Sequence, residues 1–138
     1  CDTAFCTKNA KYALTETKLG LIPATISPYV HAKIGESNAR NIALSARVLS
    51  SEEALRIGLV TEVVEDLDTA VAAEASQYLS LAPDAVAATK ALFRRLGPKI
   101  DADVIEQTIE RLADTWENPE AMVGGSGFFE QRSPYWAG

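Results

Sequence analysis

The order of apolar and polar residues predicts a few short strands near the start of the chain. Residues 1–6, which are apolar apart from Asp2 and Thr3, are typical of a short buried strand, and residues 11–14 alternate as a second strand does. Residues 59–64 give the clearest strand signal, because they are largely β-branched and lie between Gly58 and Glu65. These three strands are too few to complete a sheet under the helices that follow.

Capping residues and apolar spacing predict helices over most of the remaining chain. Ser27 as an N-cap and Pro28 after it are typical of a helix start, and Gly35 is typical of a helix end. Ser50 and Glu53 have the spacing of a capping box, which predicts a further short helix. The expected helices cover residues 28–34, 36–46, 51–57, 67–81, 85–96, 101–116 and 119–123.

The glycine-rich run at residues 124–127 predicts a break or hinge in the helical part of the chain. A phosphate-binding loop is the other interpretation of such a run. That loop needs a different spacing and a Lys followed by Ser or Thr, which this sequence lacks at that place. Residues 128–132 follow this run.

Composition and charge narrow the classes of function. The chain has 138 residues, which suits one compact domain or half of a larger one. Asp and Glu outnumber Lys and Arg by 19 to 13, which gives a net charge of −6 and argues against a nucleic-acid binder. A small anionic ligand stays open, because a few local cations and backbone N–H groups bind one. No apolar run approaches the roughly 20 residues of a membrane span.

The cysteines and the single histidine indicate neither a disulfide framework nor a metal site. Cys1 and Cys6 are predicted to be small buried residues in a reducing compartment, so we expect a cytoplasmic location. His31 has no Cys or His neighbours at ligand spacing, and we expect no metal. The sequence begins with Cys1 rather than Met and shows no basic leader, from which we expect a fragment or a processed N-terminus.

Glu16 is the strongest candidate for chemistry in the sequence. It follows a predicted strand and precedes a Gly/Pro loop at residues 20–23. A carboxylate beside apolar neighbours suits general acid or base catalysis. Removal from solvent disfavours its charged form, so it binds a proton more readily near neutral pH. A solvated loop glutamate next to Thr17 and Lys18 explains the same residue, and one carboxylate alone is a weak signal.

Five stretches of the chain carry a common pattern when they are taken in order. They are TETKLGLIP at residues 15–23, IG at 34–35, SARVL at 45–49, EALRIGLV at 53–60 and FEQRSP at 129–134. In combination they resemble the C-terminal half of the crotonase family, the enoyl-CoA hydratases and isomerases. The resemblance extends over essentially the whole chain. It is greatest to hydratases of branched or dicarboxylic acyl-CoAs, such as methylglutaconyl-CoA hydratase.

The resemblance implies an α/β fold, the C-terminal part of a crotonase-type β-sheet spiral followed by a mostly helical region. Residues 1–66 would end the core domain and carry the acid/base glutamate loop. Residues 67–138 would form a helical region that serves oligomerisation and covers the CoA. Family members form trimers and dimers of trimers. The resemblance therefore implies that an N-terminal half or neighbouring subunits of a trimer or hexamer cover these helices.

The resemblance also implies a role for Glu16, which matches the second of two glutamates that act as an acid/base pair around a water molecule. The first glutamate, and both backbone N–H groups that polarise the thioester carbonyl, are expected before Cys1. The turn that begins at Ala24 departs from the glycine-rich turn that often follows the family's proline. Gly20, Leu21, Ile22 and Pro23 match the loop that walls the acyl pocket, and Ala24 is expected to help shape that pocket.

The end of the chain matches the family's last helix, which helps to cover the CoA nucleotide. Phe129 offers a ring for the adenine, and Arg132 offers a cation for the phosphates. Core or interface packing explains Phe129 and its neighbour Phe128 equally well. The resemblance implies no cofactor, because coenzyme A is part of the acyl-CoA substrate.

Three functions fit these residues. The first is hydration of an enoyl-CoA by an intact parent enzyme, favoured because Glu16 stands where the family's hydratases carry a glutamate. The second is a non-catalytic fragment that oligomerises or binds acyl-CoA. We expect the 138 residues alone to be inactive, because losing the N–H donors costs roughly 10²-fold or more in rate. The third is isomerisation, which needs only one carboxylate, or hydrolysis or decarboxylation on the same scaffold.

Overall fold

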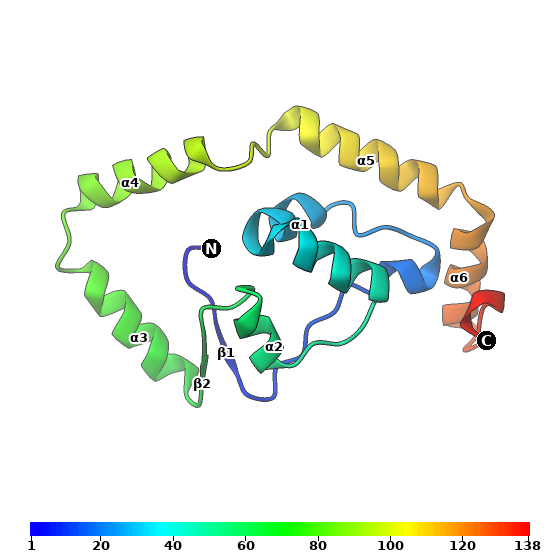
Figure 1. The fold of residues 1–138 in the computed structure, drawn as a ribbon, viewed down its shortest axis with the longest axis horizontal. Coiled ribbons are helices and arrows are strands. Elements are labelled where there is room, and N and C mark those ends of the chain that lie inside the picture. The colour runs from blue at the N-terminus through cyan, green and yellow to red at the C-terminus, as the bar shows by residue number, and fades with distance from the viewer. The chain divides into compact units, whose positions relative to one another are not determined.

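The computed structural model describes all residues from 1 to 138 and divides into two compact units (Figure 1). Unit 1 consists of residues 1–12 and 49–99, and unit 2 consists of residues 13–48 and 100–138. Unit 1 contains strands β1 (Phe5–Thr7) and β2 (Glu62–Val64) and helices α2 (Ser51–Arg56), α3 (Leu67–Tyr78) and α4 (Pro83–Leu96). Unit 2 contains the 3₁₀ helix η1 (Glu16–Leu19), helices α1 (Ser27–Ser45), α5 (Ala102–Trp116) and α6 (Pro119–Phe129), and the 3₁₀ helix η2 (Tyr135–Ala137).

The core of unit 1 lies between its two strands and α2. The strands pair in parallel, with Cys6 opposite Val63. Cys6, Ala54 and Val60 form a buried cluster, and Leu49 is completely buried. Cys6 is therefore the small buried residue that was predicted, whereas the same prediction for Cys1 is wrong because Cys1 is exposed.

The strands are shorter than the apolar pattern predicts. Residues 59–60 do not extend β2, because the N–H groups of Leu59 and Val60 bond the carbonyl of Ala54 and close the turn after α2. Residues 11–14 form no strand, and only Tyr12 makes a single antiparallel bridge, to Leu49. The α/β class is confirmed with little sheet, since most of the chain is helical.

Local capping signals place several helices as predicted. Ser50 accepts a hydrogen bond from the Glu53 N–H at 3.2 Å, and the Glu53 carboxylate accepts one from the Ser50 N–H at 3.1 Å, so the capping box is confirmed. Helix α1 has non-helical geometry at Gly35, with φ 75° and ψ 163°, where the first of two helices was predicted to end. Ser27 lies inside α1 rather than capping it, because its hydroxyl donates to the Pro23 carbonyl.

The predicted break at residues 124–127 is wrong, because α6 continues to Phe129. The glycines instead allow other backbone segments to approach the helix closely. A Cβ atom on Gly124 would lie 2.4 Å from the carbonyl oxygen of Leu19, and one on Gly127 would lie 2.6 Å from that of Arg132. Both glycines are buried against backbone that follows or precedes the helix in sequence. The glycines therefore permit backbone contacts that any side chain would block.

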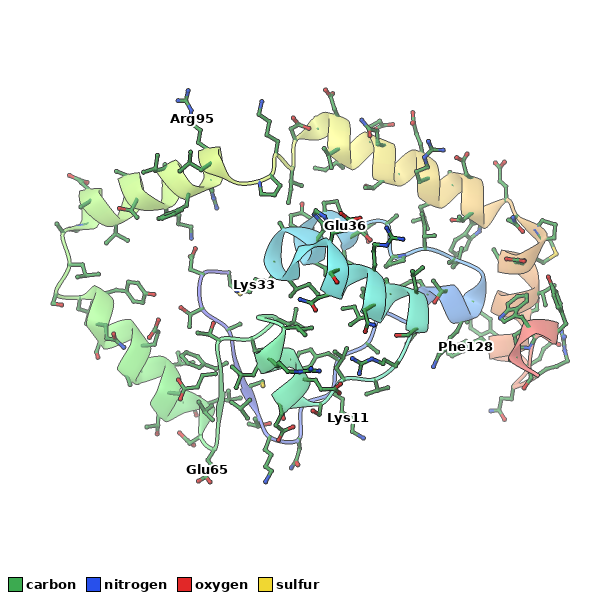
Figure 2. All side chains as sticks on the ribbon, in the orientation of Figure 1. Lys11, Lys33, Glu36, Glu65, Arg95 and Phe128 are labelled. Carbon is green, nitrogen blue, oxygen red and sulfur yellow. The ribbon has the colours of Figure 1, made fainter.

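Helices α3, α4 and α5 bury no residue. Apolar side chains such as Phe93 and Leu96 of α4, and Ile109 and Trp116 of α5, are exposed. Among the polar side chains of α4, Arg95 extends away from the ribbon (Figure 2). None of the helices is long and apolar enough to cross a membrane.

Candidate functional site

Glu16 is the first residue of η1, the 3₁₀ turn of unit 2. Its Oε2 atom is buried and has no hydrogen-bond partner. A buried polar atom without a partner is unfavourable, and a catalytic role is one of the reasons why a folded protein keeps such an atom. The prediction that Glu16 directly follows a strand is wrong, because the chain before it makes only the single bridge at Tyr12. The carboxylate is instead presented by a tight turn.

The loop after η1 is tied to the backbone of Glu16. Gly20 ends η1 in the left-handed conformation, with φ 70° and ψ 21°, which suits glycine. The Leu21 N–H then donates to the Glu16 carbonyl at 3.1 Å. Pro23 and Ala24 are buried, while Leu21 and Ile22 are half-buried. The predicted pocket residues therefore lie directly beside Glu16 along the chain, in a loop whose start is fixed relative to it.

The 3₁₀ turn is also anchored to α1. The Thr17 hydroxyl donates a hydrogen bond to the Ala43 carbonyl at 3.1 Å, in a partly buried position. Because Thr17 follows Glu16 directly, this bond restrains the turn next to the carboxylate. Nothing in the sequence pattern around Thr17 signals this bond, since its partner lies in a later helix.

A cavity of about 830 Å³ lies between η1, the end of α1 and the end of α6. Two cations, Lys18 and Arg132, line it, together with Phe128. Phe128 lies where α6 approaches η1 (Figure 2). Sequence reasoning missed Lys18 as a lining residue, because it considered this residue only as a solvated neighbour of Glu16. The spacing of two residues from the candidate carboxylate was the only available signal.

The structure does not bring all predicted CoA-binding residues together. Phe129 does not line this cavity, is 84% exposed, and meets Phe128 edge to face at 5.6 Å. Arg132 lies beyond the end of α6, so its predicted place in the last helix is wrong. Its Nε and Nη2 atoms donate to one carboxylate oxygen of Glu130 at 3.1 and 3.0 Å. Glu16 does not line the cavity either.

No group of three or more His, Cys, Asp or Glu side chains is arranged to hold a metal ion. Glu16 therefore remains the one carboxylate in the structure that combines a buried, unpartnered oxygen with a constrained backbone.

A comparison with protein families decides what kind of chain this is. The family model for enoyl-CoA hydratase/isomerase matches residues 1–138. The chain belongs to the enoyl-CoA hydratase/isomerase family. The resemblance to crotonases is thereby confirmed at the level of the family.

Individual members of the enoyl-CoA hydratase/isomerase family show the degree of similarity. A carnitinyl-CoA dehydratase of Salmonella typhi is 28% identical over 144 residues, which cover 99% of this chain and 55% of that protein. The crystal structure of an enoyl-CoA hydratase from Mycobacterium avium matches with 31% identity and a TM-score of 0.85, over 99% of this chain and 54% of that one. The crystal structure of a carnitinyl-CoA hydratase from the same species matches with 26% identity and a TM-score of 0.84. This match covers 98% of this chain and 54% of that one.

The chain spans about half the length of the relatives it matches. Their names include carnitinyl-CoA dehydratase and hydratase, so the particular resemblance to methylglutaconyl-CoA hydratase stays a prediction. The same holds for the assignment to the C-terminal part of the sheet spiral and for the functional boundary at residue 66.

Proposed function

We propose that the complete protein containing these residues is an enoyl-CoA hydratase, which adds water across the α,β double bond of an acyl-CoA thioester. Glu16 is one of its acid/base groups. The observation that carries the proposal is the buried, unpartnered Oε2 of Glu16 on a constrained turn, in a chain of the enoyl-CoA hydratase/isomerase family.

The chemistry explains why such an oxygen would be kept unpaired. In hydration, the oxygen of water bonds to the β-carbon, one proton of that water passes to a carboxylate, and the α-carbon gains a proton. A carboxylate oxygen without a protein partner is available to accept the proton. Negative charge develops on the thioester carbonyl, and preorganised N–H donors must stabilise it. The proposal assigns these donors and the second glutamate to residues outside the 138 described.

The loop that follows Glu16 would form one wall of the acyl pocket. Its buried Pro23 and Ala24 and half-buried Leu21 and Ile22 offer apolar surface beside the carboxylate. Residues outside the 138 described would complete this pocket, and they decide whether it accepts a branched or dicarboxylic acyl group. The proposed substrate class therefore stays at the level of 2-enoyl-CoA thioesters.

The coenzyme A part of the substrate would contact the end of the chain. The exposed ring of Phe129 is accessible for stacking on adenine. Arg132 lines the 830 Å³ cavity with Lys18, which supports a role in binding phosphate groups. Binding would require Arg132 to exchange Glu130 for a phosphate. No cofactor other than this part of the substrate is proposed.

Oligomerisation is also part of the proposal. The exposed apolar side chains of α4 and α5 support a role for residues 67–138 in contacts with other parts of the complete protein or with neighbouring subunits. The native mass of the complete protein tests this. A mass equal to three or six subunits supports a trimer or hexamer, and a monomeric mass contradicts it.

The test of the catalytic role replaces one carboxylate at a time in the complete protein. Glu16→Gln should lower kcat for hydration of a 2-enoyl-CoA by roughly 10²–10⁴-fold, as expected for loss of a general acid or base. The matched control is Glu106→Gln in α5, whose side chain is exposed. Hydration is followed by the loss of ultraviolet absorbance of the conjugated thioester. An unchanged rate in the Glu16 variant contradicts the proposed role.

Isomerisation is the second candidate, because the family model that matches the chain covers both hydratases and isomerases. The same preparations are therefore assayed with a 3-enoyl-CoA. Conversion to the 2-enoyl-CoA without hydration favours the isomerase. Binding of acyl-CoA without either reaction favours the non-catalytic alternative.

A further inference from the structure

The turn that carries Glu16 is restrained by two helices of unit 2. On the side of α1, the Ala43 carbonyl accepts the hydrogen bond from Thr17. On the side of α6, the backbone approaches η1 so closely that no side chain fits between them. A Cβ atom on Gly124 would lie 2.4, 2.5 and 2.7 Å from the O, C and Cα atoms of Leu19.

The contact between η1 and α6 is reciprocal. A Cβ atom on Gly20, which ends η1, would lie 2.6 Å from the carbonyl carbon of Glu120 in the first turn of α6. Each segment thus places a glycine against the backbone of the other. Backbone atoms cannot rotate aside as a flexible side chain can, so these two contacts restrain the position of η1 firmly.

We propose that Gly124 and Thr17 are positioning residues for Glu16. They touch the turn that carries the carboxylate, and they determine where that carboxylate stands in the active site. The inference rests on the proposed function of Glu16. A real Cβ contact requires at least about 3.0 Å, so a methyl group on Gly124, at 2.4 Å from Leu19, forces η1 and α6 apart. Catalytic groups tolerate only roughly 0.5 Å of displacement.

The glycines of α6 supply matched controls for this idea. A Cβ atom on Gly125 meets nothing within 4 Å, so Gly125→Ala adds the same methyl group to the same helix without touching η1. A Cβ atom on Gly127 meets the Arg132 carbonyl oxygen at 2.6 Å, so Gly127→Ala creates a comparable clash away from η1. Comparison of the three variants separates displacement of η1 from general disturbance of α6.

The experiment measures kcat and KM of the complete protein with the 2-enoyl-CoA that it converts fastest. Gly124→Ala should lower kcat by roughly 10–100-fold, because a displacement near 1 Å costs about that much in rate. KM should change little, since Gly124 is not proposed to touch the substrate. Gly125→Ala should keep the kcat and KM of the wild type. Gly127→Ala should keep most of kcat but raise KM, because its clash displaces Arg132, which is proposed to bind the phosphates of the substrate.

A second pair of variants avoids the steric clash. Thr17→Val keeps the shape of the side chain and removes the hydroxyl that bonds Ala43, whereas Thr17→Ser keeps the hydroxyl. The Val variant should lose roughly tenfold in kcat with little change in KM, and the Ser variant should recover most of the loss. This pair decides the question if Gly124→Ala fails to fold, which circular dichroism and urea unfolding reveal.

The outcomes distinguish this inference from the proposed function. The inference is overturned if folded Gly124→Ala and Thr17→Val keep the wild-type kcat, or if Gly127→Ala loses as much kcat as Gly124→Ala. Glu16→Gln is assayed alongside. If Glu16→Gln keeps its rate, the proposed function itself fails. If Glu16→Gln is slow while the positioning variants are fast, only the positioning inference fails.

Discussion

Replacing Glu16 by an apolar residue should make the protein more stable. The Oε2 atom of Glu16 is buried without a partner, and an unsatisfied buried polar group costs about 1–3 kcal/mol of folding free energy. Met has a similar length, and its thioether needs no hydrogen bond. Because the rest of the Glu16 side chain is only half-buried, we expect the lower part of that range. Glu16→Met should therefore raise the free energy of unfolding by about 1–2 kcal/mol.

The assay is urea unfolding of the complete protein, followed by circular dichroism and intrinsic fluorescence. The control is Glu106→Met, whose exposed position predicts a change within about 0.5 kcal/mol. The reasoning is refuted if folded Glu16→Met is no more stable than the wild type. A gain in stability together with a loss of hydration is the combination expected of a carboxylate kept for chemistry.

Three further predictions concern unit 1. Leu49→Ala, at a completely buried site, should lower the free energy of unfolding by about 2–5 kcal/mol in urea, and a loss below 1 kcal/mol contradicts the core described. Ser50→Ala removes the cap of α2 and should cost about 1 kcal/mol, whereas Ser50→Asp should keep the cap and most of the stability. A hydrogen bond with Cys6 and, to a lesser degree, burial raise the pKa of Tyr12 from its ordinary value of 10.0 to about 12. The neutral phenol is favoured in the fold, so this contribution to stability is complete below pH 10.0 and is lost as the pH rises through about 12. Ultraviolet titration measures that pKa, and Cys6→Ala should lower it.

Local signals in the sequence predicted local structure well. Ser50 and Glu53 lie three residues apart and form a capping box because both partners belong to one turn of helix. Asp101 likewise caps α5 through the Val104 N–H at 3.2 Å. Such contacts depend on a few neighbouring residues, and the printed sequence contains all of them.

Contacts between distant segments were beyond reach of the sequence. The run at residues 124–127 has the composition of a hinge, yet it is helical because Gly124 meets the backbone of Leu19, far away in the sequence. The apolar pattern of residues 59–60 also misled, for a local reason: it indicates a strand, but Leu59 and Val60 bond back to Ala54 in the turn after α2. Neither the contact of Gly124 nor the turn at residues 59–60 has a recognisable signal in a single sequence.

The candidate site shows the same contrast between local features, which the sequence indicates, and contacts that depend on the folded chain. Family resemblance identified Glu16 and the loop after it, and the structure brings these together on one turn. Resemblance also grouped Phe129 with Arg132, yet only Arg132 lines the cavity beside η1. The difference arises because Arg132 lies past the end of α6, where the chain turns back toward Gly127.

The division of unit 1 between two separate stretches of chain determines when it folds during synthesis. The Ala4 N–H donates to the Thr61 hydroxyl across 57 residues, and Lys90 pairs with Asp2 across 88. At a synthesis rate of about 5–20 residues per second, β2 becomes available to pair with β1 only roughly 3–11 s after β1 is made. During that time the edge of β1 that β2 later covers is open, and other chains can join it. Slower translation between residues 12 and 62 lengthens this exposure, so the yield of folded protein depends on the speed of the ribosome over that stretch.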